Sequence, residues 1–219
     1  MGTLYWQIDD CWPVASWSSM DYYKRWKALH YAAKKTYEPI IVSPVMKKDT
    51  FNVYIVSDKF EPVKAELVVK VIDFDGKEVY NKSTQVKVKA NESKSYLKIK
   101  KEVLIGNSDE GKIAVVCQLI NDKEILADNI LFFQQPKDLV LEKPEIKMNV
   151  TKNDNGYSVE LSTNKLAKDV YLSIDEDGFF TDNYFDLLPG VVKKIELKTS
   201  KEISSIENKI KVVSLVDSF

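Results

Sequence analysis

Two acidic residues and three tryptophans lie close together near the amino terminus, and their types suit the binding of a sugar. Asp9 and Asp10 stand between Trp6 and Trp12, and Trp17 follows shortly after. The C–H faces of a sugar can stack on indole rings while its hydroxyls bond to carboxylates. Aromatic surfaces with a few placed polar groups are the usual lining of small-molecule sites. The spacing therefore indicates a carbohydrate-binding loop.

The elements around this loop are those of a barrel-type α/β enzyme. Thr3–Ile8 is rich in apolar and aromatic residues and predicts a strand whose carboxyl end opens into the loop. A helix should follow, capped by Ser18, Ser19 or Asp21 and ending near Tyr37, before Pro39. One strand and one helix cannot close a barrel. We therefore expect residues 1–40 to be poorly satisfied without further barrel elements.

From Phe51 onward the pattern changes to one that is typical of β-sandwiches. Apolar and polar residues alternate in short runs without helices, and Asp75-Gly76 and Asn155-Gly156 are hairpin-turn signals. A polar segment bounded by Pro136 and Pro144 indicates a link between two sets of strands. The expected strands are Phe51–Val56, Ala65–Ile72, Gln85–Lys89, Ser95–Lys100, Lys112–Ile120 and Ile125–Phe133, then Glu145–Thr151, Tyr157–Thr163, Asp169–Ile174, Val191–Leu197 and Lys209–Leu215.

Composition argues against nucleic-acid and membrane partners. The 219 residues carry a formal net charge of −1, and Arg25 is the single arginine. Readout of nucleic-acid bases depends heavily on bidentate arginine. No apolar run approaches the roughly 20 residues of a membrane span. We expect no nucleic acid and no membrane as partners.

The remaining reactive residue types suggest structural roles and no cofactor. Cys117 lies in an apolar run and should be a buried core thiol, whereas Cys11 lies in the open loop. His30, the only histidine, is expected to be a satisfied structural residue. The acidic run Asp175–Asp177 lacks the ligand spacing of an EF-hand and predicts a turn. Neither a metal nor a cofactor is expected.

The amino-terminal motif resembles a known family. The segment G-T-L-Y-W-Q-x-x-D-C-W-P-V-x-S-W-S-S-x-D-Y, followed by R-W-K-A-L-H-Y, is similar to the last strand, loop and helix of the catalytic barrel in β-mannosidases of glycoside hydrolase family 2. Phe180–Gly190 and the ending Val213–Asp217 resemble the family's last immunoglobulin-like domain. The resemblance covers essentially the whole chain and implies the carboxyl-terminal piece of a larger enzyme.

The resemblance implies a mainly β fold of two immunoglobulin-like sandwiches, preceded by a strand-loop-helix remnant of a (β/α)8 barrel. The expected domains are residues 1–40, 41–136 and 143–219. The family's two catalytic glutamates lie on earlier barrel strands, so no catalytic residue is expected in this chain. Asp9 and Asp10 are adjacent, and neighbouring side chains on extended backbone point to opposite faces, so they cannot easily flank one glycosidic bond.

The same resemblance assigns substrate-binding candidates. Trp6 corresponds to the platform of the terminal-sugar subsite, although packing in the barrel core is an alternative. Asp10 could bond a sugar hydroxyl or brace the loop, and Trp12 could line the entrance or hold the loop. Asp9 stands where relatives commonly have asparagine, so no role is carried over to it. Trp17 and Trp26 are expected to pack.

The favoured function is therefore that of a carboxyl-terminal part of a retaining exo-β-mannosidase, inactive by itself. Its partners would be a β-mannoside-type carbohydrate, bound through the complete enzyme, and the missing catalytic barrel. A related family 2 glycosidase such as a β-galactosidase, or a non-catalytic carbohydrate-binding or adhesion module, are the alternatives. The compartment is open; a periplasmic, secreted or lysosomal parent is compatible with the family.

Overall fold

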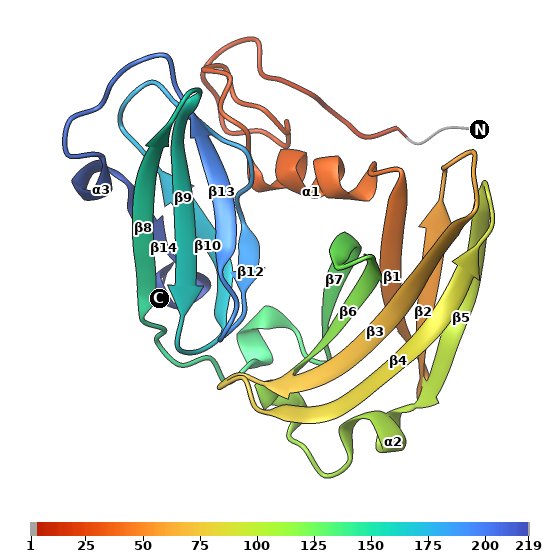
Figure 1. The fold of residues 1–219 in the computed structure, drawn as a ribbon. Coiled ribbons are helices and arrows are strands. Elements are labelled where there is room, and N and C mark those ends of the chain that lie inside the picture. Colours follow the sequence, from red (N-terminus) through yellow and green to blue (C-terminus); the bar gives the residue numbers. More distant parts are fainter. Residues whose placement is uncertain (1–3, 219) are drawn as a thin grey trace. The chain divides into compact units, whose positions relative to one another are not determined.

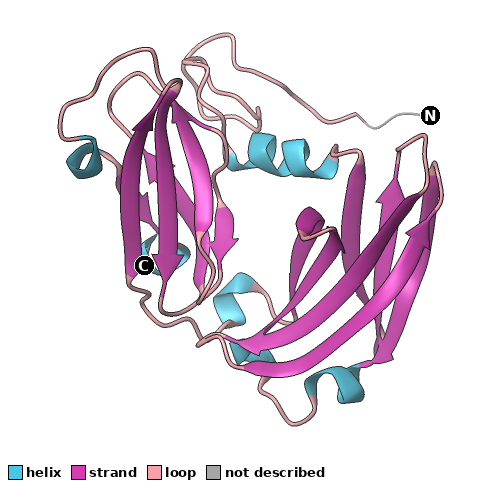
Figure 2. Ribbon diagram, viewed as in Figure 1, coloured by secondary structure: helices cyan, strands magenta, loops and turns pink. Residues whose placement is uncertain are grey.

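The computed structural model describes residues 4–218, and these residues fold mainly as antiparallel strands (Figure 1; Figure 2). Contacts divide the chain into two compact units. One runs from Glu38 to Glu142, and the other combines the leading segment up to Tyr37 with Lys143–Phe219. Each unit contains one sandwich of two sheets with a hydrophobic core of its own. The mainly β fold predicted from the sequence is confirmed.

The first unit is a sandwich of a three-stranded and a four-stranded sheet. Phe51, Val53 and Ile55 alternate along one strand, and all three are fully buried because they share the face that meets the other sheet. Full burial of such a side chain contributes about 1.5–3 kcal/mol. The sheet orders are β1-β2-β5 and β4-β3-β6-β7. The elements are β1 (Ile40–Lys47), β2 (Thr50–Ser57), β3 (Val63–Asp73), β4 (Glu78–Val88), β5 (Glu92–Lys100), α2 (Lys101–Ile105), β6 (Ile113–Asn121) and β7 (Glu124–Phe132).

Two edge strands of this sandwich differ from the sequence-based expectation. Strand β1 was not predicted, because Pro44 interrupts the pattern; an edge strand tolerates a proline since one of its sides needs no partner. Strand β4 begins at Glu78 rather than Gln85, and its first half is polar and largely exposed at the edge of its sheet. Hydrogen bonds to a neighbouring strand define both segments, and in the first half of β4 no buried side chain accompanies them.

The second sandwich is smaller and contains two strands too short for a periodic signal. Phe179–Phe180 and Phe185–Leu187 pair with longer strands and contribute Phe180, Phe185 and Leu187 to the core. The sheet orders are β11-β13-β9-β8 and β12-β10-β14. The elements are β8 (Ile146–Asn153), β9 (Gly156–Thr163), β10 (Ala167–Ser173), β11 (Phe179–Phe180), β12 (Phe185–Leu187), β13 (Lys193–Lys198), α3 (Ile206–Lys209) and β14 (Lys211–Val213).

The leading segment departs most from its prediction. The expected strand Thr3–Ile8 is wrong over its described part, residues 4–8, which contain no strand. Isolated bridges join Asp9 to Met20 and Met20 to Trp26 instead. A strand needs neighbours for its N–H and C=O groups, and those that a barrel would provide are not part of this chain.

The helix of this segment, α1 (Ala28–Thr36), begins later than predicted. Asp21, an expected cap, instead accepts hydrogen bonds from the backbone N–H and Nε of Arg25, at 2.9 and 2.6 Å. Lys24 has a φ of 64°, a left-handed conformation that no helix continues through. The turn over residues 21–25 therefore displaces the helix start.

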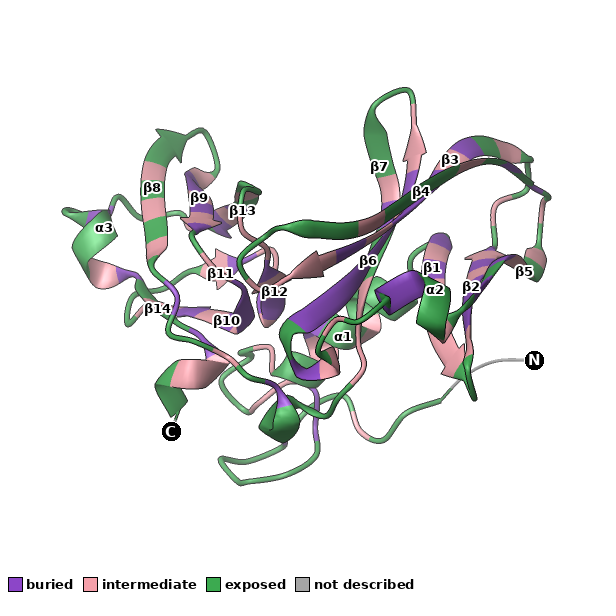
Figure 3. Cartoon of the chain, turned by 90° about the horizontal axis from the view of Figure 1, so that it is seen from below, coloured by how far each residue is buried: buried purple, intermediate pink, exposed green. Residues whose placement is uncertain are grey.

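Helix α1 packs against the second sandwich, so this part of the leading segment has partners within the chain. Tyr31 is buried, with 6% of its surface exposed, and its hydroxyl donates to the carbonyl of Phe180 at 3.1 Å. Lys34 donates to the carbonyl of Thr181 at 2.8 Å, and the rings of Trp26 and Phe179 lie 4.7 Å apart. The loop before the helix remains largely exposed, as Figure 3 shows by its green colour.

Candidate functional site

Asp10 lies at the centre of a hydrogen-bonded loop. Only 5% of the residue is exposed, and its carboxylate accepts from Ser16 Oγ at 2.5 Å, Ser18 Oγ at 2.8 Å and Lys27 Nζ at 3.2 Å. The bond from Ser16, and then those from Ser18 and Lys27, lower the pKa of Asp10 from its ordinary value, against the opposing effect of burial. Asp10 is therefore an ionised group that ties the start of the loop to its end.

The indoles of the loop point largely into solvent. Trp6 is 74% exposed and Trp12 is 64% exposed. Trp17, which was expected to pack, is 73% exposed, so that prediction is wrong for the described part of this chain. Trp26 packs as expected, against Tyr31 and Phe179. The contacts of the Asp10 carboxylate are with serines and a lysine, not with either candidate indole.

Sequence reasoning missed three members of this arrangement. Ser16, Ser18 and Lys27 were not candidates for the site, although together they donate hydrogen bonds to the buried carboxylate of Asp10. The S-W-S-S run was visible as a cap signal, but nothing in its spacing indicated that the hydroxyls turn back toward Asp10. Asp9, by contrast, is exposed, and its backbone carbonyl accepts from Gln7 Nε2 at 3.1 Å.

Within the described residues 4–218, the histidine and the two cysteines show no arrangement of a reactive site. His30 Nδ1 lies 2.9 Å from Ser19 Oγ, in keeping with the structural role expected for it. Cys117 is fully buried, and burial raises the pKa of its thiol to about 12, whereas Cys11 is exposed. Among the described residues no group of three or more histidine, cysteine or acidic side chains could hold a metal ion. No helix in the described part is long and apolar enough to cross a membrane.

The acidic run after β10 is neutralised by lysines. Asp175 pairs with Lys211 at 3.0 Å, and Glu176 pairs with Lys209 at 2.7 Å. The bond from Lys209 lowers the pKa of Glu176. The run itself is a bend between β10 and β11, as the sequence predicted.

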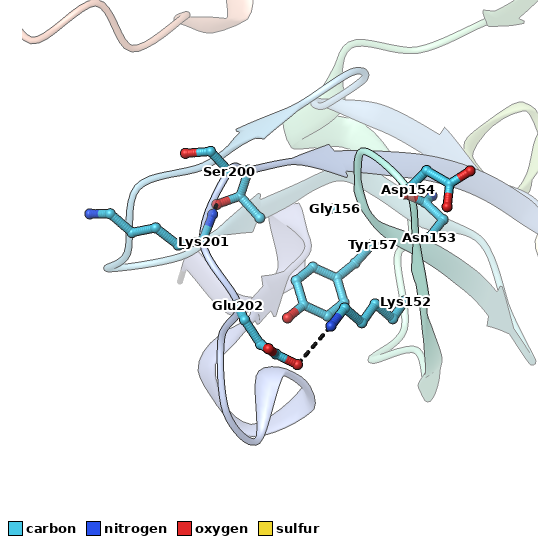
Figure 4. A pocket seen from close by; sticks show the side chains of 9 residues that line it. Lys152, Asn153, Asp154, Gly156, Tyr157, Ser200, Lys201 and Glu202 are labelled. Atoms are coloured by element: carbon cyan, nitrogen blue, oxygen red, sulfur yellow. Dashed lines mark hydrogen bonds and ion pairs between the residues drawn. The ribbon is translucent and has the colours of Figure 1, made fainter.

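A small hollow of about 180 Å³ lies beside the β8–β9 turn (Figure 4). Lys152 and Glu202 face each other across it at 2.6 Å, with 62% and 78% of their side chains exposed. The hydroxyl of Tyr157 donates to the carbonyl of Ile203 and accepts from its N–H, at 3.2 and 2.8 Å. Lys152, Glu202 and Tyr157 are thus each paired within this chain.

Comparison with known families agrees with two separate sandwich domains. Residues 49–138 match the family model described as a Mannosidase Ig/CBM-like domain, and residues 141–218 match that of an Ig-fold domain. The class defined by fold and matches is thus a chain of two immunoglobulin-like β-sandwich domains, preceded by a tryptophan-rich loop and one helix.

The relatives make the assignment more specific. Over 215 residues the chain is 29% identical to β-mannosidase A of Neosartorya fischeri, and over 214 residues 30% identical to β-mannosidase A of Aspergillus terreus. Each match covers 89% of this chain and 23% of the relative. The chain is homologous to the carboxyl-terminal part of β-mannosidases, and the family resemblance of the sequence is confirmed.

Solved structures show the same arrangement of elements. The crystal structure of β-D-mannosidase from Dictyoglomus thermophilum matches with a TM-score of 0.85 and 27% identity, over 96% of this chain and 26% of that one. An exo-chitosanase from Amycolatopsis orientalis matches with a TM-score of 0.66 at 15% identity, over 96% of this chain and 30% of that one, which shows a shared fold alone. This chain therefore spans about a quarter of the length of its relatives.

Proposed function

We propose that this chain is the carboxyl-terminal part of a retaining exo-β-mannosidase. In this proposal residues 41–136 and 143–219 are supporting sandwiches, and residues 1–40 complete the catalytic barrel. The observation that carries it is the pairing of an exposed indole, Trp6, with a loop that Asp10 holds in shape, in a chain homologous to β-mannosidases. An exposed indole is suited to stack against a sugar ring.

The proposal assigns no catalytic residue to this chain. Retaining hydrolysis needs two carboxyl groups about 5–5.5 Å apart, one of which is protonated to act as general acid. Asp10 has a lowered pKa and three donors on its carboxylate, so it is neither a proton source nor a free nucleophile. These contacts support the loop-bracing role of Asp10 over direct bonding to a sugar hydroxyl. Trp6 and Trp12 remain the proposed sugar contacts.

The test uses aryl glycosides and two proteins. The isolated 219-residue chain should not hydrolyse 4-nitrophenyl β-mannoside, because both carboxyl groups of the double displacement would lie on the barrel that it lacks. A longer protein that carries this segment behind a complete barrel should hydrolyse the mannoside in preference to the β-galactoside and the β-glucosaminide. Turnover by the isolated chain that Asp9→Asn or Asp10→Asn abolishes would contradict the proposal, as would preference of the longer protein for the galactoside.

A binding module is the second candidate, favoured by the description of the matched domain over residues 49–138 as Ig/CBM-like. It predicts that the isolated chain is retarded in affinity electrophoresis through β-mannan. Retardation that persists after deletion of residues 1–37 would place sugar binding in the sandwiches. Retardation that disappears with Trp6→Ala would place it in the loop.

A further inference from the structure

Ser19 bonds to the backbone that follows Trp6 and to the side chain of the residue before it. The residue is fully buried, although it belongs to a largely exposed loop. Its N–H donates to the carbonyl of Gln7 at 3.0 Å, and its Oγ donates to the carbonyl of Ile8 at 3.0 Å. The same Oγ lies 3.3 Å from the hydroxyl of Tyr5. The residues immediately before and after Trp6 are thus both bonded to one serine.

Hydrogen counting at this serine determines what His30 must do. A hydroxyl has one hydrogen to donate and two lone pairs that accept. The hydrogen of Ser19 Oγ goes to the carbonyl of Ile8, which can only accept. His30 Nδ1, 2.9 Å from the same oxygen, must therefore donate to it. Nδ1 of His30 consequently carries a proton, and the Tyr5 hydroxyl supplies the other donor.

The second sandwich holds His30 from the opposite side. The imidazole lies against the indole of Trp26, with ring centres 4.1 Å apart, and that indole meets Phe179 of β11 edge-on at 4.7 Å. One residue further along the helix, Tyr31 donates to the carbonyl of Phe180. A continuous series of contacts therefore runs from β11 through Trp26, His30 and Ser19 to the backbone that follows Trp6.

We propose that Ser19 and His30 are positioning residues that set the place of the Trp6 indole, with the second sandwich as their support through Trp26. The inference rests on the proposed function only in its consequence for turnover. As a statement about the loop it rests on the contacts above. Deletion of the donor at His30 should release Trp6 without disturbing the core of the sandwich, because the contacts of His30 lie between the loop and Trp26.

The experiment uses the 219-residue chain, labelled with ¹⁵N-histidine or 5-fluorotryptophan. Nitrogen spectra of the neutral imidazole should show the proton on Nδ1. Replacing each tryptophan in turn by phenylalanine assigns the fluorine spectra. The His30→Phe variant keeps an aromatic ring against Trp26 but loses the donor, so the Trp6 signal should shift or broaden. His30→Asn, whose amide can donate from nearly the same place, should restore the signal. Ser19→Ala should reproduce the effect of His30→Phe.

Ser158→Ala is the matched control. Ser158 is another buried serine of the same unit, but its hydroxyl has no hydrogen-bond partner among the described residues. The Trp6 signal should be unchanged in this variant. A proton on Nε2 of His30 would overturn the inference, as would an unchanged Trp6 signal in a folded His30→Phe chain. If Ser19→Ala does not fold, His30→Phe and its asparagine counterpart still decide the question.

Kinetics of the longer protein separate this inference from the proposed function. His30→Phe should lower kcat/KM for the aryl β-mannoside by about 10- to 100-fold, since displacements near 1 Å have effects of that order, and His30→Asn should recover most of the loss. Absence of turnover in the unaltered longer protein would defeat the proposed function and leave the spectroscopic result in force. If the unaltered longer protein turns over the mannoside and His30→Phe has the same kcat/KM, the inference is contradicted while the proposed function stands.

Discussion

At the scale of single residues, charge and burial assign different tasks to neighbouring side chains. Asp9 and Asp10 are adjacent in sequence, yet Asp9 is exposed while Asp10 is buried among three donors. The difference arises because Ser16, Ser18 and Lys27 turn back toward one of the two carboxylates. Of the two aspartates, Asp10 is therefore the one that can hold the loop in shape.

Asp10→Asn should lower the melting temperature at neutral pH, because the amide cannot accept three hydrogen bonds as the carboxylate does. The folded-state pKa of Asp10 lies below the ordinary 3.8. Its stabilisation is therefore present above pH 3.8 and is lost as the pH falls through the lower, folded-state value.

Thermal unfolding between pH 7 and pH 3 measures this effect. The unaltered chain should lose stability at the acid end, and Asp10→Asn should lack that part of the loss. Asp9→Asn, at the exposed neighbouring position, is the control and should behave like the unaltered chain. Equal melting curves for both variants would show that Asp10 does not brace the loop.

Trp6→Ala should reduce the specificity constant of the longer protein while leaving its melting temperature nearly unchanged, since the side chain is 74% exposed. Loss of a stacking platform is comparable to truncation of an aromatic anchor, about 2–4 kcal/mol, which is roughly 30- to 1,000-fold at 1.36 kcal/mol per decade. Trp6→Phe keeps part of the ring face and should lose less.

Steady-state kinetics on the aryl β-mannoside, paired with thermal unfolding of the same proteins, tests this prediction. Trp17→Ala serves as the control, because Trp17 is similarly exposed, at 73%, and has no proposed contact with the sugar. Kinetics of Trp6→Ala that match those of the unaltered protein would remove Trp6 from the sugar site.

At the scale of elements, the hairpin of β8 and β9 fixes the register of these two strands. It depends on a glycine with a positive φ directly after the turn. Strands β8 and β9 turn at Asp154-Asn155, and Gly156 follows with a φ of 134°. A Cβ at Gly156 would lie 2.2 Å from the carbonyl oxygen of Leu197 on β13, so the glycine also allows β9 and β13 to pair closely.

Gly156→Ala should destabilise the second unit by more than about 2 kcal/mol, because backbone strain at a positive φ, about 1–3 kcal/mol, adds to the collision with β13. Gly106→Ala is the matched control, since Gly106 also has a positive φ, 55°, but a Cβ there would meet nothing within 4 Å. Denaturant unfolding of the two variants should show the larger loss at Gly156. Equal losses would show that strain alone, and not the close approach, matters there.

At the scale of the whole molecule, the leading segment belongs with the second sandwich although it is adjacent in sequence to the first. Its contribution to a core is small: Tyr31 is the one buried hydrophobic side chain in the described residues before Ile40. The first sandwich has a complete core of its own. The two units should therefore respond differently to loss of this segment.

Deletion of residues 1–37 should destabilise the second unit by about 3–5 kcal/mol, the range for removal of a buried aromatic side chain, and leave the first unit unchanged. Calorimetry of residues 38–219 and of the complete chain measures this difference, with a separate fragment of residues 38–142 to assign its transition. A shift of the first unit's transition by the same amount would show that the contacts of the leading segment are not confined to the second unit.

The sequence by itself determined the parts of this protein that depend on local periodicity. Alternation of apolar and polar residues located most of the long strands, and the apolar run around Cys117 correctly predicted a core position. Side chains alternate across any strand, so one-face burial can be read from neighbouring residues alone. The family resemblance likewise depended on a contiguous motif, and the homology to β-mannosidases confirmed it.

Only the tertiary structure decided which distant groups satisfy one another. The absence of a strand over residues 4–8 and the edge strand that contains Pro44 both depend on whether a hydrogen-bonding neighbour is present. The donors on Asp10, and the contact of Ser19 with His30, likewise join residues six to seventeen positions apart, with at least one partner of each pair in irregular backbone. No sequence period specifies such pairs, because loop dihedral angles, and not a repeating geometry, bring them together.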